Sequence, residues 1–317
     1  MTVGTLVLII AALLIIFWVA PCFVMVLLLC YGHWDHDFAM KKEYYKPFIC
    51  EMESSINYLE NLSPARISIS ARDGAKLSAL WFDNASSSTV LFAHGFKASA
   101  YSNSCMQAKF FWEQGFNILL IDQRAHGLSD GKAATFGVNE QYDIELWLKW
   151  LKSNTNSEHI TAYGVSMGSA SIGYLSSRID RVMLDNMILD CGFTSPYLQM
   201  ENVANERKIP WRIMAPLVGV FSKLMLKADL KESVSASLAK TDIPALFIHG
   251  TNDCVVDPSH SQINYNSCSS AKEILLVENA DHTTAFVLGG EQIREKIMDF
   301  ITIHTRREKY ERVGDSC

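Results

Sequence analysis

The run Gly164-Val165-Ser166-Met167-Gly168 decides the fold of this chain. It matches the pattern G-x-S-x-G, in which a serine sits on a sharp turn between a strand and a helix. Residues 159–163 before it are typical of a short buried strand, and residues 169–179 after it, rich in Ala, Ser and Leu, are typical of a helix. Glycines on both sides let neighbouring elements approach closely, while the serine itself takes strained backbone. The pattern predicts Ser166 as a nucleophile at a helix N-terminus, where amide groups favour developing negative charge.

The side chains that must assist a serine nucleophile come later in the chain. A serine hydroxyl needs a base to accept its proton, and that base needs an acid to orient it and stabilise its positive charge. We predict His282 as the base, because it lies on a polar loop directly after residues 274–277, an apolar run typical of a strand. The other histidines after the serine have structural explanations: a strand end for His249, and helices for His260 and His304.

Two aspartates compete for the role of the orienting acid. Asp253 lies on the loop after one predicted strand, and Asp190 ends an earlier one. Asp281 is adjacent to His282, and neighbouring side chains rarely orient each other in this way. We predict Asp253 as the acid, with Asp190 as the main alternative.

Backbone amides must also stabilise the oxyanion that forms during acyl transfer. One should be the N–H of Met167, directly after the nucleophile. The other should come from the loop after residues 89–93, where Gly95 lets the chain turn so that the N–H of Phe96 points into the site. We expect His94 to support this loop rather than to act as a base.

Together these motifs resemble the α/β-hydrolase superfamily and, within it, the membrane-anchored bacterial esterase-like and serine-aminopeptidase-like branch. The resemblance extends from about residue 65 to 305 and implies a serine mechanism, but it says little about the substrate. It also implies that Arg124, His126 and Ser129 brace a loop near the site. The matching stretches are His94-Gly95-Phe96, residues 122–131 (DQRAHGLSDG), residues 164–168, residues 190–195 (DCGFTS), residues 249–253 (HGTND) and Asp281-His282.

Composition excludes several other classes of protein. The 317 residues carry 28 Lys and Arg against 34 Asp and Glu, a net charge of −6 without clustering, so nothing points to nucleic acid. The eight cysteines have no metal-ligand spacing and are typical of free thiols rather than of a disulfide framework. We therefore expect neither a cofactor nor a metal.

The N-terminus is the second strong feature. Residues 3–31 contain no charged side chain, and at 1.5 Å per residue a helix of this length spans about 40 Å, against about 30 Å for the hydrocarbon core of a bilayer. We predict one transmembrane helix, kinked at Pro21, with Trp18, Tyr31 and Trp34 near the interfaces. The polar residues after it, His33, Asp35, His36 and Asp37, are predicted to form an interfacial collar, with metal binding as the alternative.

Positive charge near the span indicates its orientation. No Lys or Arg precedes it, whereas Lys41, Lys42 and Lys46 follow it. The excess of positive charge on cytoplasmic loops predicts a single-pass protein of the cell membrane with its catalytic domain in the cytoplasm.

The alternation of strand and helix patterns predicts the organisation of the rest. We expect an α/β-hydrolase fold with a mainly parallel, doubly wound sheet and the site at the carboxyl ends of the strands. The alternation breaks at an apolar stretch that predicts a short helical cap. The predicted segments are a transmembrane anchor at 3–31, a juxtamembrane connection at 32–64, a hydrolase domain at 65–305 with its cap at 195–238, and a charged tail at 306–317.

These features predict a membrane-anchored serine hydrolase that cleaves carboxylic esters. The apolar cap favours an acyl chain or an aromatic ester, so the expected partners are a small acyl ester or amide and the lipid bilayer. One alternative keeps the triad and cleaves amides as an aminopeptidase, with Glu201 or Glu206 holding a substrate amine. The other is a non-catalytic membrane-bound scaffold of the same fold. The sequence does not indicate an oligomeric state.

Overall fold

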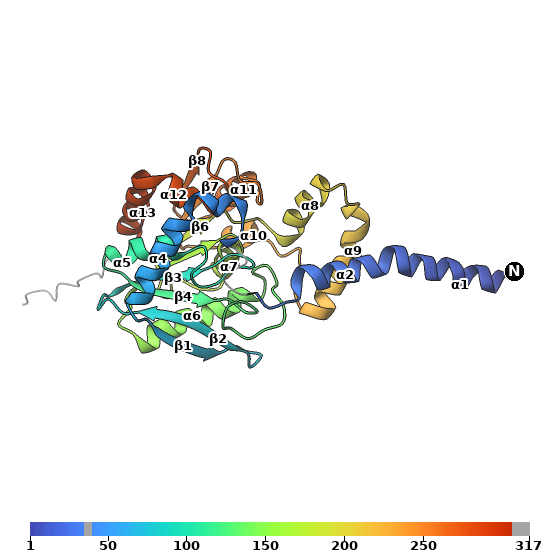
Figure 1. Cartoon of the computed structure of the whole chain (residues 1–317), viewed down its shortest axis with the longest axis horizontal. Coiled ribbons are helices and arrows are strands. Elements are labelled where there is room, and N and C mark those ends of the chain that lie inside the picture. Colours follow the sequence, from blue (N-terminus) through green and yellow to red (C-terminus); the bar gives the residue numbers. More distant parts are fainter. Residues whose placement is uncertain (35–39, 306–317) are drawn as a thin grey trace, which may run out of the picture.

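The computed structural model describes residues 1–34 and 40–305, whose strands form one eight-stranded sheet in the order β1-β2-β4-β3-β5-β6-β7-β8 (Figure 1). From β4 to β8 all neighbours are parallel, which confirms the predicted mainly parallel sheet. At the other edge β1 and β2 are antiparallel, because only a short turn with Gly74 at positive φ joins them. The strands are β1 Ala65–Ser70, β2 Lys76–Phe82, β3 Ser88–Ala93, β4 Asn117–Asp122, β5 His159–Val165, β6 Asn186–Asp190, β7 Ala245–Gly250 and β8 Lys272–Val277.

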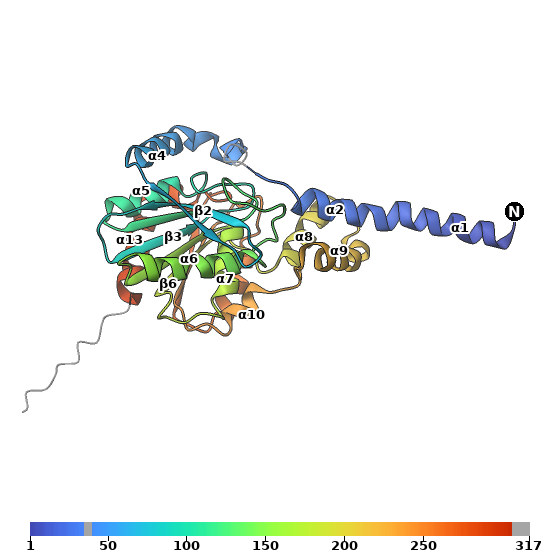
Figure 2. The same ribbon diagram turned by 90° about the horizontal axis from the view of Figure 1, so that it is seen from below.

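Helices cover both faces of this sheet, so each central strand is buried on both sides. Alternate residues of β4 enter different cores: Leu119 and Ile121 enter one, and Ile118 and Leu120 the other. Figure 2 shows α4 and α5 on one side of the strands and α6, α7 and α10 on the other. These helices are α4 Ile49–Asn61, α5 Cys105–Glu113, α6 Glu140–Asn154, α7 Met167–Leu175 and α10 Val234–Leu238; the remainder of the domain adds α11 Ser259–Ser267, α12 Ala285–Leu288 and α13 Gly290–His304.

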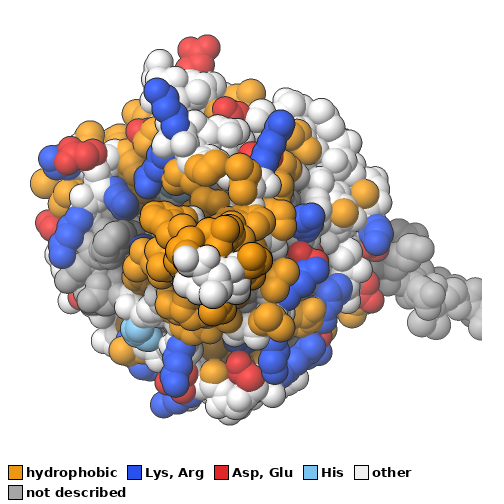
Figure 3. All heavy atoms as spheres, turned by 90° about the vertical axis from the view of Figure 1, so that its right-hand side faces the viewer, with side chains coloured by type: hydrophobic (Ala, Val, Ile, Leu, Met, Phe, Trp, Pro, Cys, Tyr) orange, Lys and Arg blue, Asp and Glu red, His pale blue; other side chains and the backbone are white. Residues whose placement is uncertain are grey.

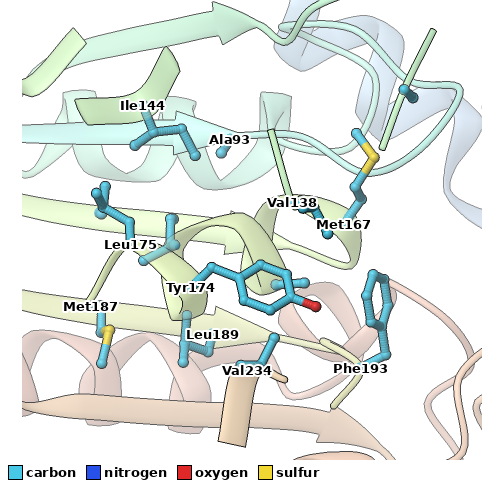
Figure 4. Close-up of a cluster of buried hydrophobic side chains, with 14 of the residues drawn as sticks. Ala93, Val138, Ile144, Met167, Tyr174, Leu175, Met187, Leu189, Phe193 and Val234 are labelled. Carbon is cyan, nitrogen blue, oxygen red and sulfur yellow. The ribbon is translucent and has the colours of Figure 1, made fainter. Parts of the chain in front are cut away.

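The core beneath α7 fixes the helix that follows the predicted nucleophile. Tyr174 of α7 lies beside Val234 of α10, and Met167 projects from its first turn (Figure 4). A Cβ at Gly173 would meet the side chain of Val234 at 2.5 Å, so only glycine permits this helix spacing. Tight packing therefore holds the start of α7 in a fixed place at the carboxyl edge of the sheet.

The N-terminal apolar run forms one long helix that projects from the domain (Figures 1 and 2). It consists of α1 Val3–Leu14, a π turn η1 Ile15–Val19, and α2 Ala20–Cys30. Pro21, where a kink was predicted, has no N–H to donate, and the chain takes its π turn directly before it. Among the described residues this is the one helix long and apolar enough to cross a membrane, with a mean hydropathy of 2.9.

Its two halves have different surroundings. No residue of α1 is buried, whereas Cys22, Val26 and Cys30 of α2 belong to the domain core. The helical cap predicted at 195–238 corresponds to α8 Pro196–Glu206 and α9 Trp211–Leu226, and α9 is the partner of α2. Figure 1 shows α9 lying across α2.

The described part of the connection after the span also packs on the domain. A short 3₁₀ helix, η2 Glu43–Phe48, leads into α4, and Tyr45, Met52 and Leu59 are buried in the second core. This segment is therefore part of the folded unit rather than a free tether. The predicted collar residues Asp35, His36 and Asp37 lie outside the described residues, as does the predicted charged tail 306–317.

Candidate active site

The G-x-S-x-G turn joins β5 to α7 as the sequence predicts. Ser166 has φ +53° and ψ −112°, a strained conformation for a residue with a side chain. Its N–H donates to the carbonyl oxygen of Asp190 at 2.8 Å, which ties the turn to the neighbouring strand. A Cβ on Gly168 would collide with the carbonyl of Ala93, and one on Gly164 with the backbone of the turn itself. Both glycines are therefore required by close backbone approach.

Three of the predicted site residues meet at the carboxyl edge of the sheet. Nε2 of His282 lies 3.1 Å from Oγ of Ser166, and Nδ1 of His282 lies 2.8 Å from Oδ2 of Asp253. With the proton on Nδ1 donated to the carboxylate, the lone pair on Nε2 faces the serine hydroxyl. The arrangement can accept the proton of Ser166 as its oxygen attacks an acyl carbon.

Asp253 is held by donors on every side. Its Oδ1 accepts hydrogen bonds from the N–H groups of Val255 and Val256, each at 2.8 Å. Its Oδ2 faces Nδ1 of His282 and also Nε2 of His249, at 3.1 Å. Burial alone would raise the pKa of this carboxyl, but the charge of His282 and the hydrogen bonds from both histidines hold the pKa well below its usual value. Asp253 is therefore ionised and acts only as an acceptor.

Asp190, the alternative acid, has a different environment. It is fully buried, and the hydroxyl of Tyr163 donates to its Oδ2 at 3.0 Å. Within residues 1–34 and 40–305 its Oδ1 has no hydrogen-bond partner. Burial raises the pKa of Asp190 to about 6, in spite of the hydrogen bond from Tyr163. Asp253, and not Asp190, is the carboxylate hydrogen-bonded to His282.

The two predicted oxyanion donors lie beside the nucleophile. Met167 is the first residue of α7, so its N–H has no intrahelical acceptor. A Cβ on Gly95 would stand 3.3 Å from Cβ of Ser166, which places the loop that carries Phe96 directly against the serine. The N–H groups flanking Phe96 are already engaged, since Gly95 donates to Oδ1 of Asn103 and Lys97 donates to Nε2 of His126.

Two buried histidines brace this loop from below. His94 accepts the N–H of Gln123 on Nε2 and donates from Nδ1 to the carbonyl of Gly95 at 2.7 Å. His126 accepts the N–H of Lys97 on Nε2 and donates from Nδ1 to the carbonyl of Arg124 at 2.8 Å. Burial lowers the pKa of both rings, so each is neutral and can accept as well as donate. These contacts support the bracing role that the sequence predicts for His94 and His126.

The other two predicted bracing residues fix the neighbouring segment 122–131. Arg124 forms a bidentate pair with Asp143, at 2.6 and 2.8 Å. The hydroxyl of Ser129 donates to the carbonyl of Asp122 at 2.6 Å and accepts the N–H of Ser78 at 2.8 Å.

Aromatic residues from the connection complete the site, a role that the sequence patterns did not predict. Trp34, expected near a membrane interface, packs its ring on Phe96 and on His126, with ring centroids 4.9 Å apart in each case. Its backbone exchanges hydrogen bonds with residues 125 and 127. Further on, the ring of Tyr44 lies 5.9 Å from that of His282, and the hydroxyl of Tyr45 accepts a hydrogen bond from Thr283. Several aromatic residues within an otherwise polar connection were the available signal, because such side chains are usually buried.

One group of described residues brings potential metal ligands together. Atoms of Cys191, Asp253 and His282 lie within 4.8 Å of one another. Both nitrogens of His282 are engaged, and burial, with the charge of Asp190, raises the pKa of the Cys191 thiol well above its usual value, which disfavours a thiolate ligand. The group fits a proton relay better than a metal centre.

A cavity of about 360 Å³ opens beside Asp253, between α8 and the loop after β7. Glu206 and Asp257 contribute to its lining, with Asn202 and Asn205 between them, so the walls are polar and acidic. Such a cavity suits a cationic or hydrogen-bonding group.

Comparison with known proteins agrees with this geometry. Residues 88–207 match the family described as alpha/beta hydrolase fold. The chain is 29% identical over 248 residues to the uncharacterized protein YfhR of Escherichia coli (strain K12), covering 75% of this chain and 81% of YfhR. It is 24% identical over 186 residues to the uncharacterized membrane protein YNL320W of Saccharomyces cerevisiae, covering 57% and 60% of the two chains.

The esterase Pf2001 of Pyrococcus furiosus has a similar solved structure. The TM-score is 0.65 at 25% identity, over 78% of this chain and 94% of the esterase. With the sheet order and the strand–turn–helix at Ser166, these findings show that the chain belongs to the α/β-hydrolase superfamily.

Proposed function

We propose that this protein is a membrane-anchored serine hydrolase that cleaves carboxylic esters through an acyl-enzyme. The observation that carries the proposal is the continuous line of hydrogen bonds from Ser166 through His282 to Asp253. The similarity to the Pyrococcus esterase supports an ester rather than another acyl substrate.

In this mechanism Oγ of Ser166 attacks the acyl carbon while Nε2 of His282 takes the hydroxyl proton. The carboxylate of Asp253 holds the ring and stabilises the imidazolium. The amides of Phe96 and Met167 donate to the tetrahedral oxyanion. His282 then gives its proton to the leaving alcohol, and a water molecule activated by the same ring hydrolyses the acyl-serine.

The anchor in this proposal is the helix Val3–Cys30, whose α1 half has no buried residue and exposes a continuous apolar surface. The similarity to a yeast protein named as a membrane protein supports the same reading. Lys41, Lys42 and Lys46 after the span favour a cytoplasmic catalytic domain.

A fluorophosphonate probe tests the proposal, because it reacts with an activated serine. The full-length protein in detergent should be labelled at one site, and Ser166→Ala should abolish both labelling and ester turnover. Ser176→Ala, at the opposite end of α7, is the control, since its hydroxyl donates to the carbonyl of Gly173. Labelling that persists without Ser166 would refute the assignment, and an unlabelled wild-type protein would favour a non-catalytic scaffold.

The acidic cavity favours one second candidate, an aminopeptidase with the same triad. Glu206 could hold the free amine of a substrate there, while Glu201, on the same helix, is not among the lining residues. A panel of acyl esters and aminoacyl amides separates the two proposals. Preference for the amides, lost in Glu206→Gln but kept in Glu201→Gln, would replace the esterase proposal.

A further inference from the structure

The cap helix α9 buries two of its faces. Its core face, with Trp211, Ala215, Val218, Ser222 and Leu226 buried, repeats every three or four residues. A second face packs on α2. There the rings of Phe221 and Phe23 meet edge to face at 5.5 Å, and the hydroxyl of Tyr31 donates to the carbonyl of Met225 at 3.2 Å.

A third face of α9 is apolar but exposed. It consists of Ile213, Pro216, Val220 and Leu224, which also recur every three or four residues and are here called the outer stripe. Ile213, Val220 and Leu224 are 59%, 49% and 74% exposed. At 100° per residue the outer stripe lies next to the face of α9 that packs on α2. On α2 itself, Val24 and Leu28 are also exposed. The exposed apolar surface of the long N-terminal helix therefore continues onto the cap.

Basic residues flank the outer stripe on its other side. Arg212, Lys223 and Lys227 are exposed and lie between the outer stripe and the core face. Lys223 pairs with Asp229 at 2.8 Å. Residues 207–231 hold six Lys and Arg and one acidic residue, in a chain whose net charge is −6. Positive charge is thus concentrated on α9 and the residues beside it, whereas α8 carries Glu201 and Glu206.

Figure 3 views the molecule along the N-terminal helix from its free end. Hydrophobic side chains surround the base of the helix, and Lys and Arg side chains lie around them. A helix with an apolar stripe and a basic edge is the pattern of an element that lies in the headgroup region of a bilayer. Anionic lipid headgroups complement the basic edge.

We propose that α9 is a membrane-surface helix that holds the cap against an anionic bilayer. Its outer stripe enters the boundary between headgroups and acyl chains, and Arg212 and Lys227 contact lipid phosphates. The inference rests on the proposed membrane span, because α2 fixes where α9 stands relative to the bilayer. It does not depend on the identity of the nucleophile or of the substrate.

Site-specific depth measurements on the full-length protein test this. Cysteines replace Leu8 on the span, Leu224 on the outer stripe, or Ile303 on α13, in a background with Cys50, Cys254 and Cys317 changed to Ser. Leu8, Leu224 and Ile303 are similarly exposed, at 71%, 74% and 67%, and α13 lies at the end of the domain away from α1 (Figure 1). Each cysteine is labelled with an environment-sensitive dye, and the protein is placed in vesicles of phosphatidylcholine with or without phosphatidylglycerol. Lipids with nitroxide-labelled acyl chains then quench any dye that lies in the bilayer.

We expect strong quenching at position 8, clear quenching at 224 and none at 303. Phosphatidylglycerol should increase quenching at 224, and Arg212→Gln with Lys227→Gln should remove that increase. If position 224 is no more quenched than 303 while position 8 is quenched, the surface proposal fails and the anchor stands. If position 8 is not quenched either, both fail. If quenching at position 224 changes neither with phosphatidylglycerol nor with the two Gln substitutions, the proposed contacts of Arg212 and Lys227 with lipid phosphates are wrong. Labelling of Ser166 by the fluorophosphonate probe is independent of all these outcomes.

Discussion

Asp253 and Asp190 are both buried carboxyl groups at the carboxyl edge of the sheet, after β7 and at the end of β6, yet their surroundings differ. Asp253 faces two backbone N–H groups and two imidazole rings. Asp190 accepts one hydrogen bond, from Tyr163, and its other oxygen has no partner among the described residues. Burial is common to both, so the number of donors decides which carboxyl is stable as an anion.

The local backbone explains this difference. Asp253 lies on a turn whose next N–H groups fold back onto its own side chain, as aspartates often do in turns. Asp190 is the last residue of a strand whose backbone groups pair with β5 and β7, so they cannot reach its carboxyl. The loop position therefore fits Asp253, rather than Asp190, to hold a histidine that becomes charged during the reaction.

The largest expected effect comes from neutralising each acid in turn. Asp253→Asn should lower kcat for an ester by about 10⁴, because the imidazolium loses its counter-charge and its orienting acceptor. Asp190→Asn should keep kcat within about tenfold of wild type, since Asp190 does not contact His282 by a hydrogen bond. Steady-state kinetics on both variants measure this, with circular dichroism to confirm folding. The opposite ranking would mean that Asp190 is the orienting acid.

The two acids should also make the free energy of unfolding depend on pH in opposite directions. The pKa of Asp190 is raised to about 6, so ionising it between about pH 4 and 6 destabilises the folded state, by up to about 3 kcal/mol. The free energy of unfolding of the wild type should therefore decline from about pH 4 to 6, and Asp190→Asn should remove this decline. The Tm of the variant relative to that of the wild type should rise across that range. The pKa of Asp253 is lowered, so its contribution is present above about pH 4 and is lost below it. A Tm difference for Asp190→Asn that stays flat from pH 4 to 7 would contradict the assigned environment.

His249 is expected to have a smaller effect through Asp253. Its Nε2 lies 2.9 Å from the carbonyl oxygen of Val256 and 3.1 Å from the carboxylate of Asp253, so its N–H is shared between these two acceptors. A full hydrogen bond to a charged group contributes about 1.5–3 kcal/mol. His249→Gln should lower kcat/KM about tenfold, as part of that energy is lost from the ionised acid. Ser261→Ala removes only the partner of the other ring nitrogen, at 2.6 Å, and serves as the control. Equal losses in the two variants would indicate a general packing defect instead.

The smallest effect belongs to Tyr163, the hydrogen-bond donor to Asp190 among the described residues. Tyr163→Phe removes its hydroxyl and should cost about 1 kcal/mol of stability near neutral pH, with kcat within about twofold of wild type. Urea denaturation and initial rates measure both quantities. A large loss of activity without a loss of stability would place Asp190 in the reaction after all.

Much of this arrangement could be predicted from the sequence, because local patterns determine it. Strands expected at 89–93, 159–163 and 274–277 lie within Ser88–Ala93, His159–Val165 and Lys272–Val277. The glycines of the nucleophile turn and the polar loops after β7 and β8 lie at the same sheet edge, so Ser166, Asp253 and His282 could be chosen together. Their chemical roles remain predictions.

The remainder depends on contacts between distant parts of the chain. The sequence favours Asp253 over Asp190 only by its loop position, and the folded positions of Val255, Val256 and His249 supply the donors that distinguish the two acids. Its place next to an apolar span predicts an interfacial position for Trp34. The neighbouring sequence does not indicate that Trp34 forms a bridge with His126 and packs on Phe96. The packing of α2 on α9 is equally non-local.

The central claim is that Ser166 carries the acyl group. The full-length protein is mixed with an excess of a p-nitrophenyl ester, quenched in acid during turnover, and its peptides are examined by mass spectrometry. The account predicts one acyl adduct per chain, on the peptide containing Ser166, and a burst of p-nitrophenol of the same stoichiometry. An acyl adduct on another residue such as Cys254, with Ser166 unmodified, would contradict it.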